Sequence, residues 1–318
     1  MDFLEKFDKQ KLQKITLIVI AALTLIALLL LLAIIVLSVE GNSDRGGILG
    51  NNDIDMEFED ITIEASQDRL GSLVLVNDTH KYDIPEELNL VKIFDYRASD
   101  SDGSSTYNLT DSSPRLEATA MTYLHRMLVQ LGKDTDNHSI MISSAFRTHE
   151  DQANLGTSIA AGYSDSHTGL IVALTVYKGV SPYLYDESNS ALESWLNQNC
   201  HKYGFVVRYP ADKVEITGVD DYTYAFRYVG IPHAKYMVDN NLCLEEYVEY
   251  LKNNTSYNEP LSITVSDDSV YYVYYTEASS GDVIKVPAKT ANPDGSMNFD
   301  YTISGTNDGG VVVTVKVK

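Results

Sequence analysis

The stretch GYSDSHTGLIVALTV, residues 162–176, decides the fold of this chain. It opens as a turn of small and polar residues, passes through His167, Thr168 and Gly169, and ends in an unbroken apolar run. An apolar run of this length after a turn predicts a buried strand at the centre of a sheet. A His at the mouth of such a strand also raises the question of a metal site, because imidazole is a common zinc ligand.

The segments around this stretch alternate irregularly between strand and helix patterns. GSLVLVNDTH (71–80), SIMISSAF (139–146), FVVRYP and YTYAFRYVG predict strands. SSPRLEATAMTYLHRMLVQLGKD (112–134) predicts a helix with a Ser-Pro start, HEDQANLGTSIAAG a helix or turn, and SALESWLNQNCHKYG and LCLEEYVEYLKNN further helices. This order predicts an α+β domain over residues 71–254 with a central, mostly antiparallel sheet.

The two ends of the chain differ from this central domain. Residues 259–318 are short strand patterns separated by Ser, Asp and Gly turns, which predicts a small all-β appendix. Residues 15–37 are uncharged and apolar, and at about 1.5 Å per residue they can span the roughly 30 Å core of a bilayer. A signal peptide is the competing interpretation, but its apolar core is shorter and an A-x-A site would follow it. Residues 15–37 therefore predict a transmembrane helix, between a tail at 1–14 and an acidic, flexible stalk at 38–70.

Charge gives the orientation of this helix and excludes some partners. The apolar run is preceded by four lysines, Lys6, Lys9, Lys11 and Lys14. Because positive charge marks the cytoplasmic side, the N-terminus is predicted inside and the domains beyond the helix outside the cell membrane. The net charge of −21 argues against nucleic acid and anionic lipid as partners of the outer part. In an oxidising compartment Cys200 and Cys243 can form one disulfide or remain two buried thiols, and the sequence leaves both open.

Six segments carry a resemblance to a known family. They are LVLVNDTHKYDIPEEL, SSAFRTHEDQ, GYSDSHTGL, WLNQNCHKYGFVVRYP, FRYVGIPHAKYM and LCLEEY. In this order and spacing they resemble the zinc D-alanyl-D-alanine carboxypeptidases of the vancomycin-resistance D,D-peptidase type, which share the Hedgehog/D,D-peptidase fold. The resemblance implies that fold for the central domain, and it implies peptidoglycan stem peptides as the ligand class.

The metal motif of that family is altered in this chain. The family has S-x-H, an Asp seven residues after that His, and later E-x-x-H before F-R-Y-V-G. The His and Asp residues hold zinc and its water, and the Glu is the general base. By resemblance the three ligand positions fall on Ser166, Ala173 and Ala225, and the base position falls on Tyr222. These residues predict that no zinc of the family type is held, and hence that the protein has no cofactor.

Neighbouring residues do not replace the missing ligands. His167 lies one place late, and the residue seven positions beyond it is Leu174. On a strand, a shift of one residue also turns a side chain to the opposite face. We therefore expect His167 to be a hydrogen-bonded polar group at the strand mouth, and His233 in GIPHAK to have a structural role.

The positions that face substrate in the family are retained. Arg147 matches the Arg that meets the terminal carboxylate of the peptide or the developing oxyanion, and a planar guanidinium suits this role. Ser164 matches the Ser that hydrogen-bonds substrate, and Gln152 matches a polar position on the same segment as Arg147. Each residue also has a plain alternative to substrate binding, namely a purely structural role. This role is a salt bridge of the scaffold for Arg147, a turn cap for Ser164 and a surface amide for Gln152.

These observations predict a membrane-anchored, extracytoplasmic and catalytically inactive relative of the D,D-carboxypeptidases. It would bind a peptidoglycan stem peptide or a cell-wall protein through the inherited cleft, because four chemical positions have changed while the frame around them persists. One alternative is an active D,D-carboxypeptidase, or a hydrolase with a relocated metal. Another is a structural protein that acts through the β appendix, whose YYVYY tyrosines either stack on sugars or fill a sheet face.

Overall fold

The computed structural model describes residues 56–97, 107–176, 190–220, 222, 224–266, 269–289 and 299–317. Residues 51–318 belong to one compact unit. Among the described residues no helix has the length and apolar character needed to cross a bilayer. The predicted transmembrane helix at 15–37 and the tail at 1–14 lie outside the described residues.

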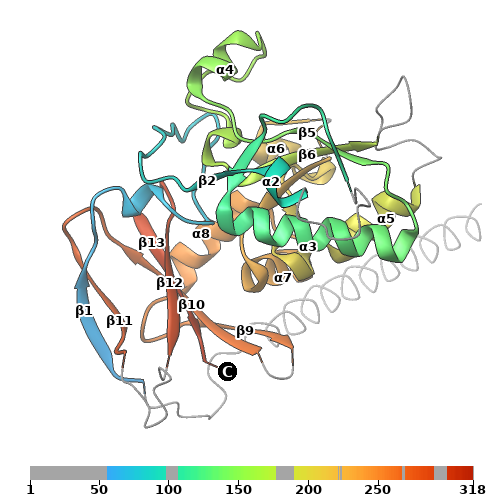
Figure 1. Ribbon diagram of the computed structural model, residues 1–318. Helices are drawn as coiled ribbons and strands as arrows, with labels where there is room; N and C mark the ends of the chain where they lie inside the picture. The colour runs from blue at the N-terminus through green and yellow to red at the C-terminus, as the bar shows by residue number, and fades with distance from the viewer. Residues whose placement is uncertain are drawn as a thin grey trace, which may run out of the picture. The chain divides into compact units, whose positions relative to one another are not determined.

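The centre of the fold is a five-stranded sheet in the order β3-β5-β6-β8-β7, of which Figure 1 labels β5 and β6. The strands are β3 (Asn108–Leu109), β5 (Ile140–Ser144), β6 (Ile171–Val176), β7 (Phe205–Val207) and β8 (Ala225–Tyr228). Only β3 and β5 pair in parallel among these described strands, and the other pairs are antiparallel. All six residues of β6 are buried, so the buried central strand and the mostly antiparallel sheet are confirmed.

Helices and single turns surround this sheet. They are α2 (Ile93–Arg97), α3 (Ala118–Thr135), α4 (His149–Asn154), α5 (Ser190–Asn199), α6 (Val214–Thr217), α7 (Ile231–Asp239), α8 (Leu244–Asn254) and the 3₁₀ turns η1 (Gln67–Arg69), η2 (Asp165–Thr168), η4 (Cys200–Tyr203) and η5 (Ala211–Lys213). The predicted Ser-Pro start of α3 is wrong. Residues 115–117 instead form β4 (Arg115–Glu117), which pairs with β2 (Leu90–Lys92). The carboxylate of Glu117 then caps α3 by accepting the N–H groups of Thr119 and Ala120.

The segment GSLVLVNDTH, predicted as a strand, has no strand pairing in the structure. Its apolar side chains are buried, as predicted for a strand, but its backbone groups find other partners. The N–H of Leu75 donates to the carbonyl of Thr306, and Arg227 Nη2 donates to the carbonyls of Ser72 and Val74. Because these partners satisfy the buried backbone, no ladder is needed there.

The β-rich part contains a four-stranded sheet in the order β12-β13-β10-β9. Its strands are β9 (Leu261–Ser266), β10 (Ser269–Glu277), β12 (Asp300–Gly305) and β13 (Gly310–Lys316). A separate pair joins β1 (Phe58–Thr62) to β11 (Val283–Pro287), and the two strands run side by side in Figure 1. The predicted flexible stalk is therefore wrong for β1, since Phe58 and Ile61 pack against the apolar core of the β-rich part. Residues 38–55 lie outside the described residues.

The β-rich part shares a core with the central domain. Leu73, Met237 and Val248 from the central domain pack in one apolar cluster with Val273 and Val312 from the β-rich part. Burial of such side chains stabilises the fold by about 1.5–3 kcal/mol each. The predicted appendix is therefore an integral layer of the fold rather than a separable one.

A buried histidine links the two parts and has the structural role that was predicted. His233 on α7 is only 4% exposed. Its Nδ1 lies 2.8 Å from the hydroxyl of Tyr247, and its Nε2 lies 3.0 Å from Oγ1 of Thr314 on β13. Burial lowers the pKa of His233 to about 3, so the ring is neutral in the folded protein at neutral pH.

This histidine makes folding stability depend on pH. Its folded pKa lies below the ordinary value of 6.5, so between these values the unfolded chain takes up a proton that the folded chain does not. Stability is therefore expected to be full above pH 6.5 and to fall as the pH drops toward 3, with a slope of up to about 1.4 kcal/mol per pH unit. Urea unfolding of the wild type and of His233→Gln between pH 7 and 4 measures this slope. Equal slopes for both proteins would contradict the prediction.

Candidate functional site

Two of the three positions that hold the metal in the family meet where β6 and β8 pair. Ala173 on β6 lies directly opposite Ala225 on β8 in the antiparallel register. Tyr222 precedes β8 and packs in the same apolar cluster as Ala225. Burial raises the pKa of Tyr222, and the positive charge of Arg147 opposes that rise. Tertiary structure thus brings Ala173, Ala225 and Tyr222 together.

An apolar cluster fills this place. Tyr222 packs with Ile171, Tyr209, Val219 and Ala225. Its ring centroid lies 5.8 Å from that of Tyr209. The cluster supplies van der Waals contact and no imidazole or carboxylate.

Arg147 lies between β5 and α4 in the chain, and its guanidinium donates hydrogen bonds to two serines. Its Nη2 donates to Oγ of Ser166 at 2.8 Å and to Oγ of Ser164 at 3.5 Å. None of the ion pairs among the described residues includes Arg147. Its Nε is buried without a hydrogen-bond partner. The salt bridge that was the plain alternative for Arg147 is thus not formed by the described residues.

A buried ion network holds the turn that carries these serines. Asp165 lies between Ser164 and Ser166, and its Oδ2 accepts from Arg208 Nε at 2.6 Å. Arg208 also donates to both carboxylate oxygens of Glu245, at 3.0 and 2.7 Å. Burial alone would raise the pKa of Glu245, but the charge and hydrogen bonds of Arg208 hold it below its ordinary value.

The sequence reasoning missed this network, although the motif segments contained its members. Arg208 stands in FVVRYP, Arg227 in FRYVG and Glu245 in LCLEEY. Arg227 Nε forms a third contact, an ion pair with Asp165 Oδ1 at 3.5 Å. Arg208 and Arg227 each stand inside an apolar strand pattern, which predicts burial. Because a buried arginine almost always has an ionic partner, this placement was the signal from which the network could have been predicted.

His167 is a satisfied polar group, as expected. Its Nδ1 lies 2.7 Å from the carbonyl of Arg147, and its Nε2 accepts the N–H of Gly162 at 3.0 Å. Burial lowers the pKa of His167, which favours the neutral ring. His167 therefore fixes the backbone of Arg147 and leaves no ring nitrogen for a metal.

Gln152 is not the surface amide that was its plain alternative. It is 2% exposed, and its Nε2 donates to Thr157 Oγ1 and to the carbonyl of Ile159, at 3.0 and 2.9 Å. These bonds anchor a loop that lines a pocket of about 360 Å³. Tyr209 lines the same pocket and also belongs to the apolar cluster, so the pocket lies beside the altered metal position.

Cys200 and Cys243 are both buried, and both are free thiols in the structure. Of the two states that the sequence left open, the structure has the unpaired one. Burial raises the pKa of each thiol to about 12. Neither is therefore a reactive thiolate at neutral pH.

This chain is similar to several known proteins. Residues 113–231 match the VanY D-alanyl-D-alanine carboxypeptidase family. A D-alanyl-D-alanine carboxypeptidase of Enterococcus faecium is 30% identical over 273 residues, which is 84% of this chain and 82% of that protein. The D,D-dipeptidase VanXYg, solved with a D-Ala-D-Ala phosphinate analogue, is 24% identical with a TM-score of 0.65 over 82% of this chain and 99% of its own. The last likeness shows the fold.

The prediction of no cofactor needs correction. A mutant of the D,D-pentapeptidase VanY from a VanB-type resistance cassette was solved in complex with Zn(II), at 26% identity and a TM-score of 0.42 over 56% of this chain and 98% of its own. Zinc is thus bound by that VanY protein. The residues at the matching positions here do not fit that ion, because Ser166, Ala173 and Ala225 offer one neutral hydroxyl and two methyl groups. In the described part of the chain no three His, Cys, Asp or Glu side chains form a group that could hold a metal ion.

Outside the altered metal positions, this chain is similar to the family over most of its length. The identity to the Enterococcus faecium protein extends over most of both chains, well beyond residues 113–231. The fold is shared with a solved D,D-dipeptidase over nearly all of that protein. This chain therefore belongs to the VanY D-alanyl-D-alanine carboxypeptidase family.

Proposed function

We propose that this protein binds the carboxyl end of a peptidoglycan stem peptide at Arg147 and does not hydrolyse it. The observation that carries the proposal is the guanidinium of Arg147, which has no carboxylate partner among the described residues and is held by the hydroxyls of Ser164 and Ser166. A carboxylate can accept two parallel hydrogen bonds from such a group. Support comes from VanXYg, which was solved with a D-Ala-D-Ala phosphinate analogue.

The rest of the peptide would lie in the adjacent pocket. Its volume of about 360 Å³ falls within the range of roughly 300–1,000 Å³ typical of small-molecule sites. Asn77, Ser158, Thr217 and Tyr163 offer polar groups along its wall, and Tyr209 offers an aromatic face. This mixture suits a peptide backbone with small side chains.

The absence of hydrolysis follows from the residue types at the altered positions. In the family's scheme a carboxylate takes a proton from the attacking water. Tyr222 stands at that position, and burial raises its pKa above the ordinary value, so its phenol stays protonated near neutral pH. A bound peptide is therefore retained rather than cleaved.

We also propose that the apolar residues 15–37 anchor the protein in the cell membrane with the domain outside. Support comes from the length of the run and from the lysines that precede it. This location would bring the peptide site to the peptidoglycan layer. A cell-wall protein with an exposed C-terminal carboxylate is the second partner class that the same site would accept.

Replacing Arg147 with alanine is expected to weaken binding of a pentapeptide ending in D-Ala-D-Ala by about 10- to 100-fold, because a charge-assisted hydrogen bond contributes about 1.5–3 kcal/mol. Isothermal titration calorimetry measures this loss. The same peptide with an amidated C-terminus should bind the wild type about as weakly as the acid binds the variant.

Arg115→Ala is the matched control, because it removes an exposed guanidinium that stacks over the neighbouring Phe146. It should leave peptide affinity unchanged. The proposal fails if the acid and the amide bind equally, or if the wild type releases D-alanine from the pentapeptide at an appreciable rate.

A further inference from the structure

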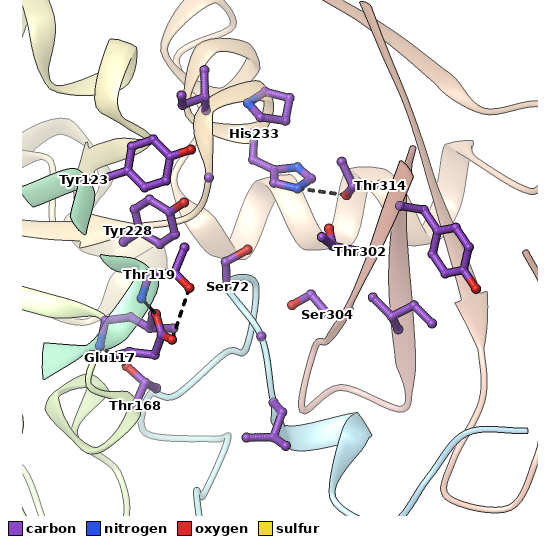
Figure 2. A pocket seen from close by; sticks show the side chains of 18 of the residues that line it. Ser72, Glu117, Thr119, Tyr123, Thr168, Tyr228, His233, Thr302, Ser304 and Thr314 are labelled. Atoms are coloured by element: carbon purple, nitrogen blue, oxygen red, sulfur yellow. Dashed lines mark hydrogen bonds between the residues drawn. The ribbon is translucent and has the colours of Figure 1, made fainter. Parts of the chain in front are cut away.

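A second pocket, of about 520 Å³, lies where the central domain meets the β-rich part (Figure 2). We call it the junction pocket. The central domain contributes Tyr123 of α3 and Tyr228 of β8, and the β-rich part contributes Tyr271 of β10 and Thr302 of β12. Arg147 and Tyr222 do not line it, so it is separate from the peptide site.

Three tyrosines, Tyr123, Tyr228 and Tyr271, line this pocket. Tyr228 is 7% exposed, and its ring stacks on that of Tyr123 with centroids 5.5 Å apart. Burial raises the pKa of Tyr228, and the nearby phenols of Tyr123 and Tyr271 add to that rise. No hydroxyl of the three is hydrogen-bonded to another of the described residues. These hydroxyls are open to the pocket, where they can donate to and accept from a ligand with hydrogen-bonding groups of its own.

Among its described residues, the inner wall of the junction pocket carries one carboxylate and no positive charge. Glu117 lines it, but its carboxylate already accepts from the N–H groups of Thr119 and Ala120 and from Thr119 Oγ1. His233 is neutral, with both ring nitrogens engaged. The remaining charged groups of the lining, Glu87, Asp300 and Lys316, are exposed. An anionic ligand would therefore lose water at the inner wall without gaining a counter-charge, which is costly.

Apolar surface alternates with the hydroxyl groups. Leu170, Ile231 and Pro232 line the pocket beside Ser72 and Thr168. Such a wall suits a ligand that has both an apolar face and a rim of hydroxyls. Carbohydrate rings have this composition, with C–H groups on the ring faces and hydroxyls at the edge.

We propose that the junction pocket binds a saccharide. The hydroxyls of Tyr123, Tyr228 and Tyr271 exchange hydrogen bonds with the ring hydroxyls, and the C–H face lies on the apolar wall. The site is built from both parts of the fold, so the β-rich part contributes directly to recognition. This role gives Tyr271 of the YYVYY segment a part in binding, and it does not depend on peptide binding at Arg147.

The test is calorimetric titration of the full chain with the tetrasaccharides of N-acetylglucosamine and of glucose. Saturable binding of at least one is expected. Tyr228→Phe and Tyr271→Phe, which remove one hydroxyl each, should weaken it by about threefold to tenfold, the effect of one hydrogen bond. Tyr272→Phe is the matched control, because Tyr272 neighbours Tyr271 on β10 but does not line the pocket.

Three results would overturn the proposal. These are no saturable binding of either tetrasaccharide, binding that both Phe variants leave unchanged, and an equal loss in Tyr272→Phe. Tyr271 is only partly buried, so its variant is expected to fold and to keep the test decisive if Tyr228→Phe is unstable. Peptide titration of the same proteins should be unaffected, which separates this outcome from failure of the Arg147 proposal.

Discussion

The fourfold variant Ser166→His, Ala173→Asp, Tyr222→Glu and Ala225→His is expected to bind zinc at least about a thousandfold more tightly than the wild type, because zinc affinity derives from deprotonated nitrogen and oxygen ligands in a fixed geometry. The geometry for two of these ligands is already present. Ala173 and Ala225 lie opposite each other in neighbouring strands, where Cβ atoms are about 4.5–5.5 Å apart and point to the same face. Replacing Tyr222 also removes the ring that packs against Ala225.

Competition with a chromogenic chelator measures the affinity, and D-alanine release from a pentapeptide gives a second readout. The matched control is the threefold variant that keeps Ala173, which lacks one ligand and should bind zinc more weakly than the fourfold variant. If the fourfold variant binds zinc no better than the wild type, the prediction is wrong. The packing of Tyr209 and Ile171 would then have closed the space that the ligands need.

Asp165→Ala is expected to lower the free energy of unfolding by about 3–5 kcal/mol, the usual cost of removing one partner from a buried ion pair. The carboxylate of Asp165 contacts two guanidinium groups, those of Arg208 and Arg227, whose side chains are fully buried. Its loss leaves these two positive charges with one carboxylate, that of Glu245. Urea unfolding followed by circular dichroism measures the change.

Asp83→Ala provides the control, because Asp83 pairs with Lys81 and both side chains are largely exposed. Such pairs contribute little, so its unfolding midpoint should match that of the wild type. A loss below about 1 kcal/mol for Asp165→Ala would show that the network does not stabilise the fold as a buried pair does. Since Asp165 lies between the serines that hold Arg147, the variant should also bind peptide less tightly.

Several features follow from the sequence by itself. Strand β6 could be predicted because five consecutive apolar residues, 170–174, follow a turn, and the five strands of the β-rich part because short apolar runs alternate with Ser, Asp and Gly. The resemblance to the family, carried by motif spacing, likewise assigned Ser166, Ala173, Tyr222 and Ala225 to one site. These properties are local periodicity and linear order, which a sequence carries directly.

Only the tertiary structure decided the remaining features, because they depend on groups far apart in the chain. Residues 71–80 are buried without being a strand, since Arg227 and the carbonyl of Thr306 satisfy their backbone. Strand β1 is ordered by pairing with β11, more than two hundred residues later. Packing between distant segments likewise decides whether Arg147 has a carboxylate partner and which hydroxyls line the junction pocket. Sequence patterns do not encode such contacts.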